Sequence, residues 1–515
     1  MSDRGPVQTM AGRRRGGALP ARPSGLVLYA VLVVLAMVSL VAVSLMFRVQ
    51  ADVQAATAGA ARQQAYLAAL SGVQRATVAL ETFADDPAVL RDNEELFRDQ
   101  LVWDDGVDQW YFTVYAYNHE DPGLVRYGIT DEATRINLNN RPRAQRATLL
   151  ALPGMTDELI DALVDYVDPD DMPEIQGAEA EHYARREIPY LIANADLSTL
   201  GELLLVRGFD ASLVYGEDAN HNGLLEPNEN DGDTTFPPDN ADGFLDRGLA
   251  GLATTVTREP DVANDGSPRL NLNGDPETLM DAGLPPETLM FIGRYRMDGH
   301  EFGDPSELLN MTYDGEDSGI GPDEIADILD RFTAAPIGDL ATLLGGTPAP
   351  APRRGGGMGA DRFDPVGLDG ADAGGDAPPA PPRRSRRAAP DRVGRVNINT
   401  APVHVLALVG DMGPEAARRI VEARDLVDPD RKRTPAWLLT EGVVDEDLFK
   451  QIAPILTTRS YQYRVKVVGY GLPSGQYCVL EAVIDLGRGR PRVMHLRQLT
   501  RLGAPFALTG PPDRL

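Results

Sequence analysis

The chain has 515 residues, of which 77 are acidic and 49 are basic, so its formal net charge is −28 at pH 7. This length allows two or three domains with substantial cores, and the acidic excess argues against a general nucleic-acid-binding protein. Cys478 is the single cysteine, which excludes an intrachain disulfide. Stability must therefore come from apolar cores and, potentially, from bound metal ions.

An apolar run at residues 26–47 predicts a transmembrane helix. It contains no charged residue and no Gly or Pro, and as a helix it would span about 33 Å, enough to cross a bilayer. Residues 1–25 carry five Arg against one Asp, which predicts a cytoplasmic leader and an exported remainder. The alternative is a cleavable secretory signal, but the run is too long for one and no A-x-A site ends it.

Residues 48–84 continue the helix beyond the membrane, because no Pro occurs between residue 48 and Pro87. Apolar residues recur at spacings of four and three, which marks one face of a helix. The stripe consists of Tyr66, Leu70, Val73, Thr77 and Leu80. We therefore expect one helix of roughly 57 residues, which serves either as a spacer stalk or as a surface that packs against other copies or partners.

Strand patterns stand on both sides of a helical middle. Within residues 85–135, the aromatic and β-branched segment 108–120 is followed by the turn Asp-Pro-Gly, which predicts a hairpin. Residues 458–505 predict a three-stranded meander that completes the same small antiparallel sheet. The fold class is therefore α+β, with a long N-terminal helix on the sheet and a large helical insertion.

Three similar segments recur within the insertion, each with a basic residue, two apolar residues alternating with two Asn, and then a Pro. They are RINLNNRP (135–142), RLNLNGDP (269–276) and RVNINTAP (395–402). Asn favours turns and helix N-caps, and Pro suits the first helical turn, so each segment predicts a short strand followed by a helix. The first and third continue as helix-hairpin-helix units, and the second is a weaker version.

Composition divides this helical middle. The segment 347–392 is rich in Pro, Gly and Arg, which predicts an extended or flexible linker. It separates an inserted α-domain, residues 136–346, from a second helix-hairpin-helix region, residues 393–457.

The most specific motif is DANHNGLLEPNE, residues 218–229, which fits the calcium-loop pattern D-x-[DN]-x-[DN]-G-x5-E at every fixed position. Ca²⁺ prefers six to eight oxygen ligands, the Gly permits the sharp turn, and the last Glu can bind with both oxygens. The predicted ligands are Asp218, Asn220, Asn222, the carbonyl group of Leu224, Glu226 and Glu229. A solvated acidic loop without a metal is the alternative. Two Asn ligands favour a weak, extracellular type of affinity and a structural role.

Other acidic groups are weaker candidates. Asp239, Asp242 and Asp246 could form a second cation site. The pairs Asp168/Asp170 and Asp428/Asp430 follow helices in similar VDPD contexts, and we expect capping or metal-shell roles for them and not a general-acid pair.

The sequence contains few motifs that are typical of enzymes or of DNA-binding proteins. The six His are scattered, and HExxH, Walker A and GxSxG motifs are absent, so we expect no enzyme. The third helix-hairpin-helix unit resembles those of competence-type DNA receptors and carries Arg418, Arg419 and Arg424. The first unit has no basic residue to meet phosphate, which dominates such binding. A membrane-anchored DNA-uptake protein is therefore the alternative function, and packing is the preferred role of the units.

The order of motifs along the chain resembles a known family. RQQAYLAALSGVQRA, TDEATRINLN, DYVDPDD, PYLIANADLSTLGELLLVRG and RVNINTAP follow one another as in the minor pseudopilin K of the type II (general) secretion pathway. The resemblance covers most of the exported chain. It implies a pilin-like fold, a pseudopilus tip capped together with minor pseudopilins I and J, help in starting its assembly, and calcium bound in the α-domain.

The resemblance also implies a processed, single-pass inner-membrane protein with a cytoplasmic N-terminus and a periplasmic bulk. Its further partners would be the major pseudopilin, the assembly platform and the prepilin peptidase. Prepilin leaders are cut after a Gly just before the apolar run, a place that Gly25 and Leu26 occupy. Ordinary pilins carry a Glu five residues into the mature chain, where Ala30 stands here. A tip subunit has no neighbour ahead whose amine such a Glu would neutralise.

Overall fold

The structure is a computed structural model with side chains. It describes residues 24–83, 86–118, 121, 123–139, 145–334, 391–410, 412–487 and 489–510. The chain divides into two compact units, residues 1–64 and 65–515. Most of the predicted leader and of the predicted linker lies outside the described residues.

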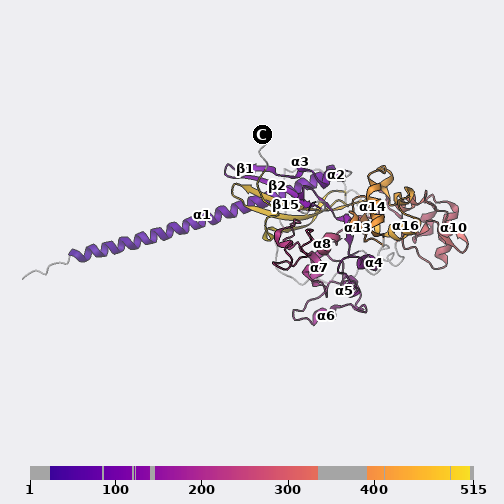
Figure 1. Ribbon diagram of the computed structural model, residues 1–515, viewed down its shortest axis with the longest axis horizontal. Helices are drawn as coiled ribbons and strands as arrows, with labels where there is room; N and C mark the ends of the chain where they lie inside the picture. The colour runs from indigo at the N-terminus through magenta and orange to yellow at the C-terminus, as the bar shows by residue number, and fades with distance from the viewer. Residues whose placement is uncertain are drawn as a thin grey trace, which may run out of the picture. The chain divides into compact units, whose positions relative to one another are not determined.

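A single helix, α1 (Ser24–Thr82), runs for 59 residues and agrees with the predicted length (Figure 1). Its N-terminal part is apolar and exposed, and it is the one described helix that is long and apolar enough to cross a membrane.

The C-terminal part of α1 is buried against the sheet through small residues. Ala65, Ala69 and Ala76 are fully buried. Of the predicted stripe, Val73 and Leu80 are buried as expected, whereas Tyr66, Leu70 and Thr77 are only half-buried. The buried face is thus centred beside the predicted stripe, on residues small enough for close approach of the helix backbone.

The sheet joins the two ends of the sequence. Its order is β1-β2-β15-β16-β17, and each neighbouring pair is antiparallel. The predicted hairpin and the C-terminal meander therefore form one sheet, in which β2 and β15 lie side by side (Figure 1). This confirms the α+β class. The main strands are β1 (Gln100–Asp104), β2 (Gln109–Tyr117), β15 (Gln462–Leu472), β16 (Tyr477–Asp485) and β17 (Arg492–Gln498), with β3 (Val125–Arg126) beside β2 and β4 (Thr130–Asp131) beside β15.

Each of the three repeats begins with a two-residue strand that pairs in parallel with a strand at its end. The pairs are β5 (Ile136–Asn137) with β6 (Ala253–Thr254), β8 (Leu270–Asn271) with β11 (Phe332–Thr333), and β13 (Val396–Asn397) with β14 (Leu456–Thr457). The second repeat, which the sequence suggested was weaker, pairs in the same way. Each repeat is thus one closed strand–helices–strand unit.

The repeat helices follow the strands as predicted. The helix pairs are α4 (Arg146–Leu150) and α5 (Asp157–Val167), α9 (Pro276–Met280) and α10 (Pro286–Met297), and α13 (Val403–Leu406) and α14 (Gly413–Arg424). One hydrophobic core runs through all three repeats, from Ile136 to Leu456. The two helical regions on either side of the predicted linker therefore share a core.

The repeated Asn residues bind loops and do not cap the helices that follow. In each repeat the first Asn side chain accepts a hydrogen bond from the second Asn N–H, at 2.8, 3.0 and 2.9 Å, which closes a turn. The second Asn side chain then donates to a carbonyl group of the loop after the helix pair: Asn139 to Leu197, Asn273 to Phe302 and Asn399 to Lys432. The predicted turn role is confirmed. The capping role is wrong for α9, which Asp275 caps.

Shorter elements complete the chain. The remaining helices are α2 (Pro87–Arg91), α3 (Glu94–Phe97), α6 (Ala180–Ala184), α7 (Ala211–Tyr215), α8 (Gly248–Leu252), α11 (Ile325–Arg331), α15 (Trp437–Thr440) and α16 (Glu446–Ile452). The remaining strands are β7 (Arg258–Pro260), β9 (Thr312–Tyr313), β10 (Glu316–Asp317) and β12 (Asp391–Val393).

Candidate cation sites and their junction with the sheet

The predicted calcium loop lies between a helix and a 3₁₀ turn. Helix α7, whose N-terminus Asp210 caps through the Leu213 N–H at 2.8 Å, ends just before it, and Pro227–Glu229 forms the turn at its end. Gly223 has φ of +78°, the left-handed conformation that Gly adopts without strain. The backbone therefore makes the sharp turn that a calcium loop requires at this position.

The side chains of the loop turn toward one another. The Asn220 and Asn222 amide groups donate to the Glu226 carboxylate at 2.8 and 3.3 Å. The Asp218 carboxylate accepts from the Gly223 N–H at 3.4 Å and is almost fully buried. Four of the predicted ligands, Asp218, Asn220, Asn222 and Glu226, are thus joined by hydrogen bonds within the loop. The N–H of Leu224, the fifth predicted ligand residue, donates to the Asn222 side chain at 2.7 Å.

The surroundings of the Glu229 side chain indicate whether the loop could hold a metal ion. Its side chain is 1% exposed, and Oε1 makes no hydrogen bond within ordinary distance and angle limits, while Oε2 accepts from the Glu226 N–H at 3.2 Å. Burial, with smaller contributions from Asp218 and Glu226, raises its pKa to about 7. A buried, unpaired carboxylate oxygen is costly, and a bound cation would supply the missing partner. The residues present therefore fit a calcium ion.

The second predicted cluster is not assembled. Asp239 accepts from the N–H groups of Asp231 and Gly232 at 3.0 and 2.8 Å, and Asp242 and Asp246 each accept from a backbone N–H two residues ahead. Asp242 and Asp246 thus each close a local turn, whereas Asp239 joins its segment to Asp231 and Gly232. The three do not form a group of ligand atoms within 4.8 Å of one another, although all lie in the described part of the chain.

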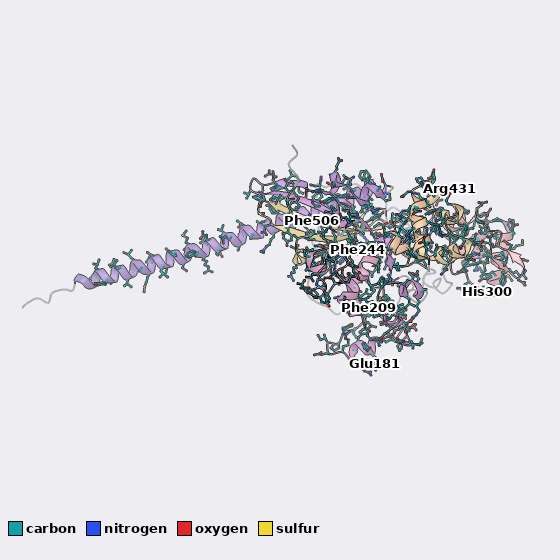
Figure 2. The ribbon with its side chains drawn as sticks, in the orientation of Figure 1. Glu181, Phe209, Phe244, His300, Arg431 and Phe506 are labelled. Carbon is teal, nitrogen blue, oxygen red and sulfur yellow. The ribbon has the colours of Figure 1, made fainter. Side chains whose placement is uncertain are left out.

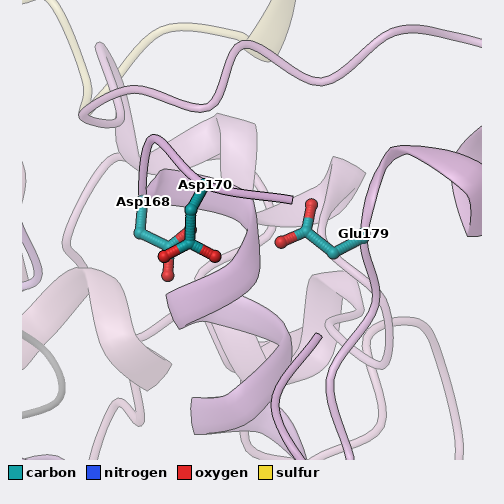
Figure 3. Close-up of side chains that lie close together, drawn as sticks. All are labelled: Asp168, Asp170 and Glu179. Atoms are coloured by element: carbon teal, nitrogen blue, oxygen red, sulfur yellow. The ribbon is translucent and has the colours of Figure 1, made fainter. Parts of the chain in front are cut away.

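A different acidic group does come together at Asp168, Asp170 and Glu179 (Figure 3). Their carboxylate oxygens lie within 4.8 Å of one another, the one such group of three or more His, Cys, Asp or Glu among the described residues. Glu179 is 8% exposed, and neither of its oxygens makes a hydrogen bond within ordinary limits. Burial, and next the charge of Asp165, raise its pKa. The sequence marked the two Asp as capping or metal-shell residues but missed Glu179, which no fixed spacing links to them.

A buried network of charges joins the first repeat to the sheet, and the sequence did not reveal it. Glu132 is fully buried and lies 2.6 Å from Arg464 Nε and 3.3 Å from Arg135. Glu481 pairs with Arg464 and Arg497, both at 2.8 Å. Most of these side chains line a cavity of about 100 Å³ between the sheet and the insertion. Buried charges are tolerated only when they are paired in this way.

The third helix-hairpin-helix unit uses its polar groups within the chain. The Gly410 N–H in its hairpin donates to Thr148 Oγ1 of the first repeat at 3.2 Å, in a buried position. Arg418 pairs with Glu415 at 2.7 Å, Arg419 donates to a carbonyl group, and so does Arg424. The Gly410 N–H and these three arginines therefore each have a partner within the chain.

The predicted processing positions lie at the start of α1. Gly25 and Leu26 are in its first turn, and Ala30 follows as an exposed residue of the apolar run.

Comparison with known proteins matches part of the chain to one family. Residues 126–215 match the family model of type II secretion system (T2SS) protein K. The type II secretion system protein K of Pseudomonas aeruginosa is 29% identical over 198 residues, which cover 36% of this chain and 57% of that protein. That of Pectobacterium carotovorum subsp. carotovorum is 35% identical over 92 residues, which cover 17% of this chain and 28% of that protein. This chain thus spans little more than half the length of the first relative.

Among solved structures, the GspK-GspI-GspJ complex from the type 2 secretion system of enterotoxigenic Escherichia coli has a TM-score of 0.36 and 13% identity. The match covers 85% of this chain and 96% of that one. The matched family segment 126–215 contains the first helix pair, the Asp168–Glu179 group and α7, and it stops before the loop 218–229. In that segment and in its match to these relatives, the chain is similar to type II secretion system protein K, as its motifs indicated.

Proposed function

We propose that this protein is a minor pseudopilin of a type II secretion system. In this role it caps the tip of the pseudopilus with minor pseudopilins I and J, and it helps to initiate assembly for protein export across the outer membrane. The observation that carries the proposal is the protein K match at residues 126–215, in a chain whose long helix lies on a small antiparallel sheet. Its location would be the inner membrane, with the N-terminus in the cytoplasm and the bulk in the periplasm.

The exposed side of α1 supports an assembly role. Leu67 and Val78 are 50% and 54% exposed, on the helix whose opposite face is buried against the sheet. A plain spacer has no need of large apolar residues facing water, whereas an assembly helix buries them against its neighbours. The major pseudopilin, the minor pseudopilins and the assembly platform are the proposed occupants.

Ala30 supports a position at the tip. A carboxylate within a bilayer is costly unless it is paired, and in a pilin the pair is formed with the amine of the neighbouring subunit. A tip subunit lacks that neighbour, so an uncharged Ala is the residue that the position favours. In this proposal the prepilin peptidase cuts between Gly25 and Leu26.

Calcium is the proposed structural cofactor. Loop 218–229 would hold one ion through the carboxylates and amides described above, and Glu229 would complete the shell. The Asp168, Asp170 and Glu179 group is a second acidic cluster, in which the buried Glu179 carboxylate makes no hydrogen bond within ordinary limits. Calorimetry of the full chain with Ca²⁺, compared with Asp218→Ala plus Glu229→Ala, tests the loop. Equal heats in both proteins would reject it.

Co-expression of the full chain with minor pseudopilins I and J tests the function. A stable ternary complex after detergent extraction is expected, and Leu67→Glu should weaken it. A matched control is Val107→Glu, at an 80% exposed position in the β1–β2 hairpin. Salt-sensitive binding of duplex DNA without a ternary complex would instead favour the DNA-uptake alternative.

A further inference from the structure

The loop 218–229 touches the sheet, and the contact involves the loop's own turn. Lys466 of β15 donates through Nζ to the carbonyl oxygen of His221 at 2.5 Å. At Gly223 an added Cβ would lie 3.4 Å from Cβ of Tyr117, at the end of β2, which is ordinary van der Waals contact. The middle of the loop therefore lies directly on two neighbouring strands.

A third contact joins a proposed ligand to the same strand. Arg247 Nε lies 3.6 Å from the Asp218 carboxylate, and the Arg247 guanidinium lies 4.5 Å from the centre of the Tyr117 ring. A guanidinium over a tyrosine face is attractive, more so when it is shielded from water as here, where Arg247 is 11% exposed. The position of Asp218 is thus linked through Arg247 to the sheet.

These contacts supplement the covalent connections between sheet and insertion. The insertion leaves the sheet after β4 and returns to it before β15, whereas the loop belongs to the interior of the insertion. Glu217, the residue just before the loop, also joins the neighbouring segment, because it accepts from the N–H groups of Asn240 and Asp246 at 3.3 and 3.1 Å. A change in the loop would therefore reach the polar stretch that carries Phe244, which is labelled in Figure 2.

The negative charges of the loop make the conformation described here, in which the loop contacts the sheet, depend on a bound cation. Asp218, Glu226 and Glu229 place three carboxylates in one partly buried loop, although their oxygens do not all lie within 4.8 Å of one another. Like charges in such a loop repel one another. A bound divalent cation removes this repulsion and holds the loop in the shape that presents the His221 carbonyl group and Gly223 to the sheet. Without it, the open loop loses both contacts.

We infer that the loop 218–229 is a calcium-dependent latch that fastens the inserted domain to strands β2 and β15 through Lys466, Tyr117 and Arg247. The inference rests on the proposed binding of calcium and adds what that binding does. Calcium would fix the orientation of the helical insertion on the sheet, and these three residues would position the loop without being ligands.

Double electron–electron resonance on the full chain in detergent tests the latch. Spin labels would be placed at Phe244→Cys in the insertion and Leu101→Cys in β1, which are 69% and 58% exposed, while Cys478 is buried. Calcium should reduce the width of the distribution of distances between the two labels about twofold. Lys466→Met should still bind calcium by calorimetry, yet its distribution should stay broad. Tyr117→Leu, which keeps an apolar contact but removes the ring, should show the same loss.

The control is Arg258→Met, which removes a half-exposed arginine that pairs with Asp196 and should leave the narrowing intact. Narrowing in Lys466→Met equal to that of the parent overturns the latch, and so does a parent that binds calcium without narrowing. A parent that binds no calcium overturns the calcium proposal itself, so the two failures are distinguishable.

Discussion

Replacing Glu132 with Gln is the sharpest test of the junction between sheet and insertion. The change keeps the size of the side chain and removes its charge, so Arg464 and Arg135 lose their carboxylate while they remain buried. Removing one partner of a buried ion pair is destabilising by about 3–5 kcal/mol, because the other charge is left uncompensated.

The pKa of Glu132 gives an independent magnitude. Burial alone would raise it, but Arg464 and Arg135 lower it to about 2 from the ordinary 4.5. Since each tenfold change in acidity is worth about 1.4 kcal/mol, the ion pairs contribute about 3 kcal/mol at neutral pH. A lowered carboxylate pKa stabilises the folded state above the unfolded value. The difference between parent and Glu132→Gln should therefore be constant from pH 7 to about 5 and vanish as the pH falls toward 2.

Hydrogen exchange measures this locally, which suits a chain with more than one cooperative unit. Loss of about 3 kcal/mol predicts amide exchange about 100-fold faster in peptides from β4 to β5 and from β15, after correction for intrinsic rates. Glu181→Gln, which breaks an exposed ion pair with Arg185, is the control and should change exchange less than threefold. Equal effects of the two changes would refute the importance of the buried network.

Three further predictions follow from the same structure. Gly469→Ala should destabilise the sheet by about 3 kcal/mol. A Cβ there would lie 2.2 Å from the Ala69 backbone nitrogen, and only a shift of α1 can relieve the clash. Urea-dependent hydrogen exchange of β15 would measure the loss. Glu229→Gln should weaken calcium binding at least tenfold in calorimetry, because it removes a charged, bidentate ligand. The mature protein should begin at Leu26 when its N-terminus is sequenced after expression with a prepilin peptidase.

Each of these three predictions has an outcome that would contradict it. Gly293→Ala is the matched control for the glycine change, since a Cβ there meets nothing within 4 Å, and equal stability of both variants would show that α1 does not lie tightly on β15. Unchanged affinity in Glu229→Gln would place calcium elsewhere. A mature chain that starts at Met1 would remove the support that the tip position draws from Ala30.

Much of the fold is predictable from local pattern. Period-two alternation in residues 461–467, the turn Asp-Pro-Gly after residue 120, and the uninterrupted helix before Pro87 each depend on neighbours in sequence, and each agrees with the structure where it is described. The buried face of α1 is centred beside the predicted stripe, because the prediction relied on large apolar residues. The close approach of Gly469 to the helix backbone selects Ala and Gly instead.

The candidate sites were less predictable from local pattern than the fold. The loop 218–229 was recognisable because its proposed ligands lie in one short segment. Asp239, Asp242 and Asp246 also have a plausible spacing, but their oxygens accept hydrogen bonds from backbone N–H groups of the same polar stretch. Glu179 was missed because its approach to Asp168 depends on the path of the chain after α5. Glu132 was missed because its partner Arg464 is 332 residues away in sequence. Pairings across such distances leave no local pattern.

The three repeats also explain why helix-hairpin-helix units occur in an acidic chain. Each unit closes on itself through a parallel strand pair and an Asn–carbonyl hydrogen bond. They then pack into one core, and the hairpin of the third donates its Gly410 N–H to Thr148 of the first. A hairpin whose N–H serves a neighbouring repeat cannot serve a phosphate at the same time. The motif in this chain therefore favours packing between protein segments over contact with nucleic acid.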